Sequence, residues 1–140
     1  MAAALCYGVG GGGAQLCFHV QPGNYDTDSL IQVLQALRHF LGGQKATLLW
    51  DGLGAHRSRA MRAFLVTQRD WLVVERLPAY APDLNPVQGL WSNLEGQELA
   101  NLACDTLGEA IGAAWHGIGR VRQAWWLPYS FLRRAGLSVS

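Results

Sequence analysis

The residues of this sequence that could do chemistry are few, and they lie in two short passages. The first passage, LLWDGLGAHRS at residues 48–58, contains an acid, Asp51, and an imidazole, His56. The run before the acid, residues 46–50, is almost wholly apolar, which is typical of a strand buried on both faces. A carboxylate at the carboxyl end of such a strand is a common position for an active site in an α/β sheet. Asp51 could equally be a turn residue before Gly52.

The second passage, LPAYAPDLNPVQGLWSN at residues 77–93, combines a proline-rich connection with a helix start. Asn85 suits the N-cap of a helix, and Pro86 suits the first helical position, where no N–H group is needed. Gln88 falls three residues after the cap, where its side chain can bond back to the cap N–H as a Glu would. The passage therefore predicts a helix over residues 86–100 with Gln88 in its first turn.

Together, the two passages resemble the signature of mariner-type bacterial insertion-sequence transposases with a DDE catalytic domain, named for two Asp and one Glu. By this resemblance, Asp51 takes the position of the second catalytic Asp, and Gln88 takes the position of the catalytic Glu. The resemblance runs over residues 5–137. It implies a ribonuclease-H-like α/β fold and an ancestral reaction of DNA cleavage and strand transfer in transposition.

The resemblance also implies a metal centre, in which two Mg²⁺ or Mn²⁺ ions flank the scissile phosphate. Such ions prefer anionic oxygen ligands, and three carboxylates hold the pair against its mutual repulsion. Asp51 is the one matching carboxylate, because Gln88 keeps a carbonyl oxygen without the charge. The strand that carries the first Asp in the family is expected to lie before Met1. We therefore expect metal binding to be weak or lost, and the chain to be catalytically inactive.

Other residues of the two passages are candidates for accessory roles. His56 could contact Asp51 or a substrate phosphate, or it could be a hydrogen-bonded loop residue. The resemblance makes Arg57, Arg59 and Asn85 candidates for contact with DNA at transposon ends. The alternative to an inactive enzyme fragment is a regulatory remnant that binds DNA, pairs with itself or pairs with a full-length transposase.

Composition leaves the partner class open. The chain has 140 residues and a formal net charge of +1, so there is no global electrostatic case for nucleic acid. Contact with DNA would need local patches, and taken alone each arginine group is more typical of a solvated helix face. The two groups are Arg57, Arg59, Arg62 and Arg69, and Arg120, Arg122, Arg133 and Arg134.

The cysteines and the apolar runs indicate the compartment. The three cysteines are odd in number and include no C-x-x-C pair, which favours buried, reduced thiols in a cytosol. The start of the chain is too short and uncharged for a signal peptide, and no apolar run approaches membrane-spanning length. These features predict a cytoplasmic protein, which the resemblance associates with the bacterial nucleoid when DNA is bound.

The pattern along the chain predicts one α/β domain over residues 1–140. In this domain helices flank a mixed sheet, and the sheet lacks its first, central strand. Losing a central strand exposes the edges of its neighbours, so either the opening hairpin pairs with the strand at residues 46–50 or the sheet stays split, and we expect the first. The predicted elements are a hairpin over residues 5–20, helices over 27–41, 58–68, 86–100 and 107–126, and strands over 46–50 and 71–77.

Overall fold

The computed structural model describes residues 1–10, 12–52, 54–100, 102–103 and 105–139. It divides into two compact units, each of which is described by itself. The terminal unit contains Met1, Ala3–Val20 and Asp83–Ser140, and the central unit contains Ala2 and Gln21–Pro82. None of the helices in the described part of the chain is long and apolar enough to cross a membrane.

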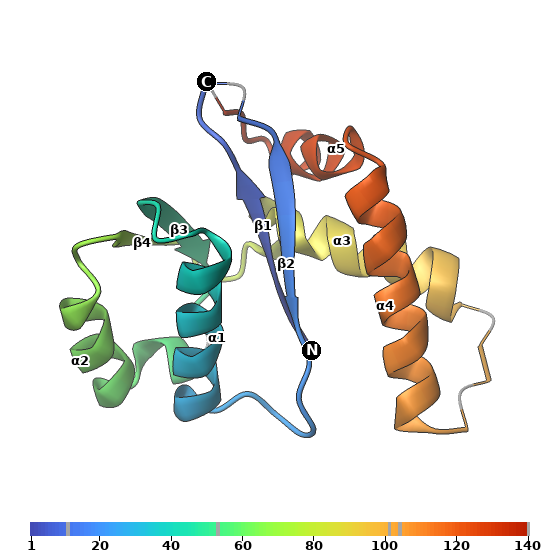
Figure 1. The fold of residues 1–140 in the computed structure, drawn as a ribbon, viewed down its shortest axis with the longest axis horizontal. Helices are drawn as coiled ribbons and strands as arrows, with labels where there is room; N and C mark the ends of the chain where they lie inside the picture. The colour runs from blue at the N-terminus through green and yellow to red at the C-terminus, as the bar shows by residue number, and fades with distance from the viewer. Residues whose placement is uncertain (11, 53, 101, 104, 140) are drawn as a thin grey trace. The chain divides into compact units, whose positions relative to one another are not determined.

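The central unit alternates helices and strands, as the sequence predicts (Figure 1). Its two strands are parallel, with Ala46 opposite Leu72 and Trp50 opposite Arg76. A parallel pair needs a crossover connection, which α2 and the short 3₁₀ turn before it provide. The elements are α1 (Thr27–Phe40), β3 (Ala46–Trp50), the 3₁₀ turn Gly54–Arg57, α2 (Arg59–Thr67) and β4 (Leu72–Arg76).

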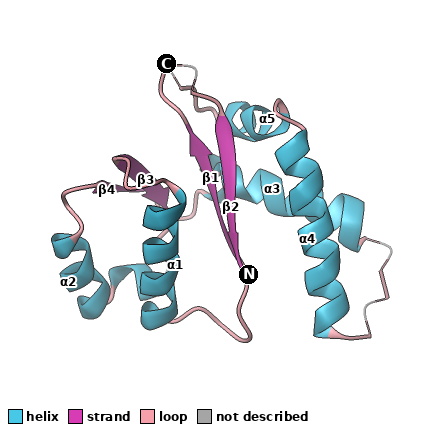
Figure 2. Cartoon of the chain, in the orientation of Figure 1, coloured by secondary structure: helices cyan, strands magenta, loops and turns pink. Residues whose placement is uncertain are grey.

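Local signals account for the helix boundaries in the central unit (Figure 2). The Asp26 side chain accepts a hydrogen bond from the Ser29 N–H at 2.9 Å, and Ser29 Oγ accepts one from the Asp26 N–H at 2.9 Å. These bonds form a capping box. The Ser29 N–H and the Ser29 hydroxyl both donate to the Asp26 carboxylate, which lowers the pKa of that carboxyl. Beyond the other end of α1, Gly42 and Gly43 adopt φ of 63° and 77°, a region that favours glycine and stops a helix.

The prediction that the strand at residues 46–50 is buried on both faces is wrong. Trp50 and Leu72 are buried, but Leu49 is 44% exposed and Val73 on the paired strand is 55% exposed. Successive side chains of a strand point to opposite faces, so the sheet has one covered and one open face. An apolar run does not specify whether other elements cover its second face.

The predicted opening hairpin forms, with β1 (Ala2–Tyr7) and β2 (Ala14–His19) paired in a two-stranded sheet. Its first strand begins three residues before the predicted range of 5–20. The Gly8 N–H donates to the Gly13 carbonyl at 2.8 Å. A Cβ on Gly8 would lie 2.6 Å from the Gly12 Cα, so glycine at position 8 lets the two ends of the turn approach each other closely.

The predicted pairing of this hairpin with the strand at residues 46–50 is wrong. Within the described ranges, β1–β2 and β3–β4 are two separate sheets. β2 instead buries Leu16 and Phe18 in the apolar core of the terminal unit, where Phe18 packs edge-on against Trp115 of α4 at 4.8 Å between ring centroids. This burial gives the hairpin a packing partner other than β3.

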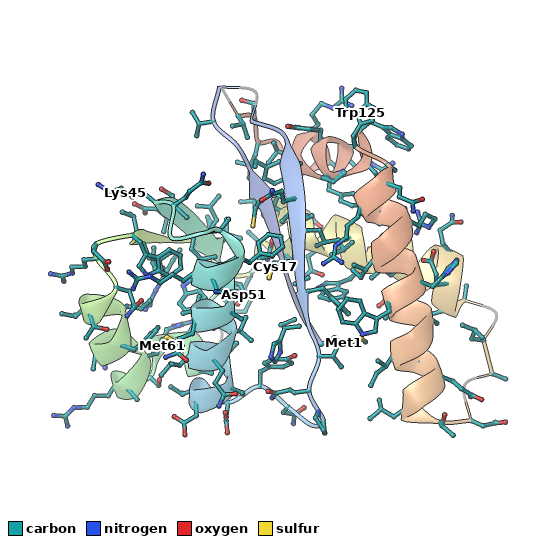
Figure 3. All side chains as sticks on the ribbon, viewed as in Figure 1. Met1, Cys17, Lys45, Asp51, Met61 and Trp125 are labelled. Atoms are coloured by element: carbon teal, nitrogen blue, oxygen red, sulfur yellow. The ribbon has the colours of Figure 1, made fainter. Side chains whose placement is uncertain are left out.

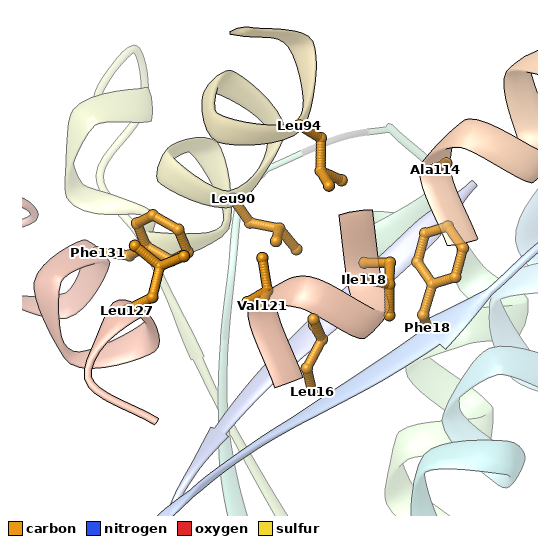
Figure 4. Packing of buried hydrophobic residues seen from close by; sticks show 9 residues of the cluster. All are labelled: Leu16, Phe18, Leu90, Leu94, Ala114, Ile118, Val121, Leu127 and Phe131. Carbon is orange, nitrogen blue, oxygen red and sulfur yellow. The ribbon is translucent and has the colours of Figure 1, made fainter. Parts of the chain in front are cut away.

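The terminal unit is built around one apolar core, shown in Figure 4. The helices that surround the core, together with β2, are α3 (Pro86–Leu94), the π-helical turn Glu95–Leu99, α4 (Leu107–Gln123) and α5 (Leu127–Arg134). The buried members of the core are Leu16, Phe18, Leu90, Leu94, Ala114, Ile118, Val121, Leu127 and Phe131.

Two helix ends in the terminal unit differ from prediction. The α-helix predicted over residues 86–100 changes to a π turn after Leu94, and the helix predicted over 107–126 ends at Gln123. Its start is as predicted, because Thr106 and Glu109 form a capping box. Trp125 falls within the predicted range of this helix, but in the structure it lies beyond the helix end and is 77% exposed. A separate helix, α5, follows with Pro128 in its first turn, where a missing N–H is tolerated.

Two of the three cysteines, Cys6 and Cys17, are free and partly buried. Burial raises the pKa of the Cys6 thiol to about 11, and it also raises the pKa of Cys17. Thiols of this kind react poorly, because the thiolate is the nucleophilic form. Cys104 lies outside the described residues.

Candidate active site

Asp51 directly follows the last residue of β3, at the edge of the sheet where both parallel strands end. The next backbone bond of the ladder runs from the Leu77 N–H to the Trp50 carbonyl at 2.9 Å. This bond holds the backbone just before the acid. The Asp51 side chain, labelled in Figure 3, is 44% exposed, so it can reach solvent.

His56 holds the carboxylate in place. Its Nδ1 lies 3.1 Å from Asp51 Oδ1 and 2.9 Å from the Asp51 carbonyl oxygen. A carbonyl oxygen can only accept, so Nδ1 carries the proton in this arrangement. The imidazole is buried and stacks on Trp50, with 4.1 Å between ring centroids and 3° between planes. Of the roles considered for His56, the structure has two, the contact with the Asp51 carboxylate and a hydrogen bond to the backbone of the loop.

Arg57 contributes to the loop that follows Asp51. Its Nε donates to the Gly52 carbonyl at 2.8 Å, and its Nη2 contacts the same oxygen. The guanidinium lies so close that a Cβ on Gly52 would overlap it. Ser58 accepts from the Met61 N–H at 3.1 Å and caps α2, whose exposed first residue is Arg59. Arg57 therefore stabilises this loop, whereas Arg59 faces solvent.

Asn85 and Gln88 lie at the start of α3 in the terminal unit. Asn85 is the N-cap as predicted, and its Oδ1 accepts from the Val87 N–H at 3.1 Å. The predicted bond from the Gln88 side chain back to the cap is absent from this described helix start. Only the Gln88 backbone N–H participates, donating to the Asn85 carbonyl at 3.0 Å. The Gln88 side chain is exposed, so water can satisfy its amide and the return bond is not required.

The residues assigned to the metal centre do not fit a pair of divalent cations. Asp51 of the central unit supplies a carboxylate, but Gln88 of the terminal unit supplies a neutral amide. In the portion of the chain that the structure describes, no three His, Cys, Asp or Glu residues form a group that could hold a metal ion. Mg²⁺ pairs in phosphoryl-transfer sites are held by several anionic oxygens.

One charged cluster in the terminal unit was not predicted. Arg120 donates from Nε to Glu98 Oε1 at 2.6 Å and from Nη2 to Glu98 Oε2 at 3.0 Å. It also donates to Asn93 Oδ1 at 2.6 Å, and its bonds to Glu98 raise its pKa. The sequence carries no local signal for this pair, because 22 residues separate its members. The arginine is therefore held within the fold.

Comparison with protein families shows which family the chain belongs to. The family model for the DDE superfamily endonucleases matches residues 4–109, which is most of the sequence. The chain therefore belongs to the DDE superfamily endonuclease family. No curated protein matches the chain.

Solved structures of the Mos1 mariner transposase catalytic domain share the fold. One, with raltegravir and Mn, has a TM-score of 0.54 at 22% identity and covers 85% of this chain and 70% of that chain. A second, with raltegravir and Mg, has a TM-score of 0.52 at 19% identity over 93% and 81% of the two chains. A third has a TM-score of 0.50 at 21% identity over 91% and 69%. The ribonuclease-H-like α/β fold, with short sheets flanked by helices, is thereby confirmed.

Proposed function

We propose that this chain is a DDE-type transposase catalytic domain that no longer cleaves DNA. The observation that carries the proposal is the neutral Gln88 at the position where the family motif has its acid. Asn85 and Pro86 start α3 without help from the Gln88 side chain. The helix start can therefore persist after the acid has been replaced, which supports retention of the fold with loss of the chemistry.

The partners and place of action form part of the same proposal. We infer that the ancestral substrate is DNA at the ends of a bacterial insertion sequence, in the cytoplasm or on the nucleoid. A remaining role for an inactive domain is to pair with itself or with a full-length transposase and interfere with it. Co-purification with an intact relative distinguishes this role from an inert remnant.

A plasmid-nicking assay tests the loss of cleavage. We expect the 140-residue chain to nick supercoiled DNA no faster than its Asp51→Ala variant, with either Mg²⁺ or Mn²⁺. The physical reason is that a neutral amide is a poor ligand for the second dication of the pair. Nicking by the unmodified chain that Asp51→Ala abolishes would overturn the proposal.

Restoring the missing charge should strengthen metal binding. Opposite unit charges about 4 Å apart in water attract by about 1 kcal/mol, so a carboxylate and a dication gain about 2 kcal/mol. We therefore expect Gln88→Glu to tighten Mn²⁺ binding by about 30-fold, measured by electron paramagnetic resonance of free Mn²⁺.

A matched substitution controls for net charge. Gln97→Glu adds the same charge at another exposed glutamine of the terminal unit, and it should leave Mn²⁺ binding unchanged. The resemblance assigns both residues to one metal centre, so adding Asp51→Asn to Gln88→Glu should cancel the gain. A gain that persists without Asp51 would show that the two positions do not share a metal ion.

A further inference from the structure

The C-terminal part of the terminal unit is strongly basic. Residues 110–140 contain four arginines and no Asp or Glu, although the whole chain carries a net charge of only +1. Two of the four are used inside the fold, since Arg120 pairs with Glu98 and Arg122 donates to the Leu16 carbonyl at 2.9 Å. Arg133 and Arg134, in the last turn of α5, are exposed.

Exposed aromatic side chains lie beside Arg133. Trp125 and Trp126, between α4 and α5, are 77% and 54% exposed, and Trp125 is labelled in Figure 3. Together with Tyr129 and Arg133, they line an open cavity of about 400 Å³, whose other walls are Leu132 and residues 137–139. We call this feature the Trp–Arg cavity. Its volume is in the range of ligand pockets.

We propose that the Trp–Arg cavity binds single-stranded DNA. The indole rings of Trp125 and Trp126 stack on unpaired bases, and the guanidinium groups of Arg133 and Arg134 pair with the flanking phosphates. Single-strand binding sites combine these two features, because every base has a π-face and every linkage carries a negative charge. Residues 110–140 hold no acidic side chain to repel the phosphates.

Charge favours nucleic acid over a second copy of the chain as the occupant. A two-fold contact places the same patch of both copies against itself. Arg133 and Arg134 would then face their own counterparts across an aromatic contact, which like charges disfavour. A phosphodiester strand supplies the opposite charge instead.

This inference goes beyond the loss of cleavage proposed above. The residues of the Trp–Arg cavity do not include Asp51 or Gln88. DNA binding at the cavity therefore stands whether or not the metal-dependent reaction occurs. The nicking assay tests one proposal, and a binding assay without metal tests the other.

Fluorescence anisotropy of the full 140-residue chain with a labelled dodecathymidine measures the binding. We expect saturable binding in EDTA, with quenching of tryptophan fluorescence. Trp125→Ala combined with Trp126→Ala should weaken binding by about tenfold or more, because each base loses its stacking partner. Trp125→Phe combined with Trp126→Phe should retain most of the affinity, since phenyl rings still stack.

The arginines should set the salt dependence. Each phosphate contact contributes about 0.7 to the slope of log K against log salt for a single strand. Arg133→Ala combined with Arg134→Ala should therefore lower that slope by about 1.4. The matched control is Lys45→Ala combined with Arg76→Ala, which removes two exposed positive charges from the central unit and should leave the slope unchanged.

Four results would overturn the inference. One is the absence of saturable binding by the unmodified chain, and another is binding that the tryptophan variants leave intact. A third is equal affinity for a blunt duplex, in which no base is free to stack. The fourth is a result in which the tryptophan variants lose self-association, measured by sedimentation, while their DNA binding stays unchanged. An oligouridine of the same length tests whether the site also accepts RNA. Tighter binding of the oligouridine would show that the ligand is single-stranded RNA and not DNA.

Discussion

Replacing Gly117 with alanine will destabilise the terminal unit by about 3 kcal/mol, at the upper end of what overpacking usually costs. Gly117 is buried in α4. A Cβ there would overlap the Leu94 side chain and lie 2.7 Å from Glu98 Oε2. Neither neighbour can move freely, because Leu94 is 2% exposed in the apolar core and Glu98 is paired with Arg120. Urea unfolding followed by circular dichroism measures the change.

The same helix supplies two controls. Gly112 and Gly119 also lie within α4, but a Cβ at either position would meet nothing within 4 Å. Alanine is favoured over glycine in a helix by up to about 1 kcal/mol, so both substitutions should stabilise the protein. If all three variants moved stability in the same direction, the close packing of α4 on Leu94 would be wrong.

Removing the guanidinium of Arg120 will cost about 3 kcal/mol of unfolding free energy. The Glu98 side chain is only 8% exposed and receives two hydrogen bonds from Arg120. Arg120→Ala would leave that carboxylate buried without its cation, and broken buried pairs typically cost about 3–5 kcal/mol. The lower value applies because the Arg120 side chain is itself 34% exposed. Chemical denaturation at neutral pH provides the measurement.

A second substitution separates unpaired charge from lost packing. In the Arg120→Ala background, Glu98→Gln removes the charge at nearly constant shape, so it should recover part of the lost stability. The exposed pair of Arg38 and Asp70, at 2.8 Å, is the comparison. Asp70→Asn should cost less than about 1 kcal/mol, because solvent screens the pair. Equal costs for Arg120→Ala and Asp70→Asn would contradict the buried character of the Glu98 pair.

Local signals in the sequence specified the starts of α1 to α4 correctly, whereas α5 was not predicted. Asp26 and Thr106 form capping boxes, Ser58 caps α2, and Asn85 with Pro86 begins α3. These signals act within one helical turn, so the residues that decide them are neighbours in the chain. The same locality explains why the two motifs around Asp51 and Gln88 were sufficient to predict a DDE-superfamily domain, which the match over residues 4–109 confirms.

Features that depend on distant residues were not predictable in the same way. The apolar run of β3 did not reveal that Leu49 would be exposed, because burial depends on what packs against each face. The sequence placed Trp125 inside the helix predicted over residues 107–126, but α4 ends at Gln123 and Trp125 is exposed. The bond from Gln88 to its cap failed to form because exposure makes it optional.

The sequence alone therefore determined membership of the DDE superfamily, the starts of α1 to α4 and a neutral Gln88 in the first turn of α3, since each depends on residue types at short spacing. Only the tertiary structure decided that His56 contacts Asp51 while it stacks on Trp50, and that Glu98 pairs with Arg120 close to Gly117. The tertiary structure also placed Trp125 beside Arg133 in one cavity. Contacts of this kind require the folded backbone to bring side chains together, and no local pattern encodes them.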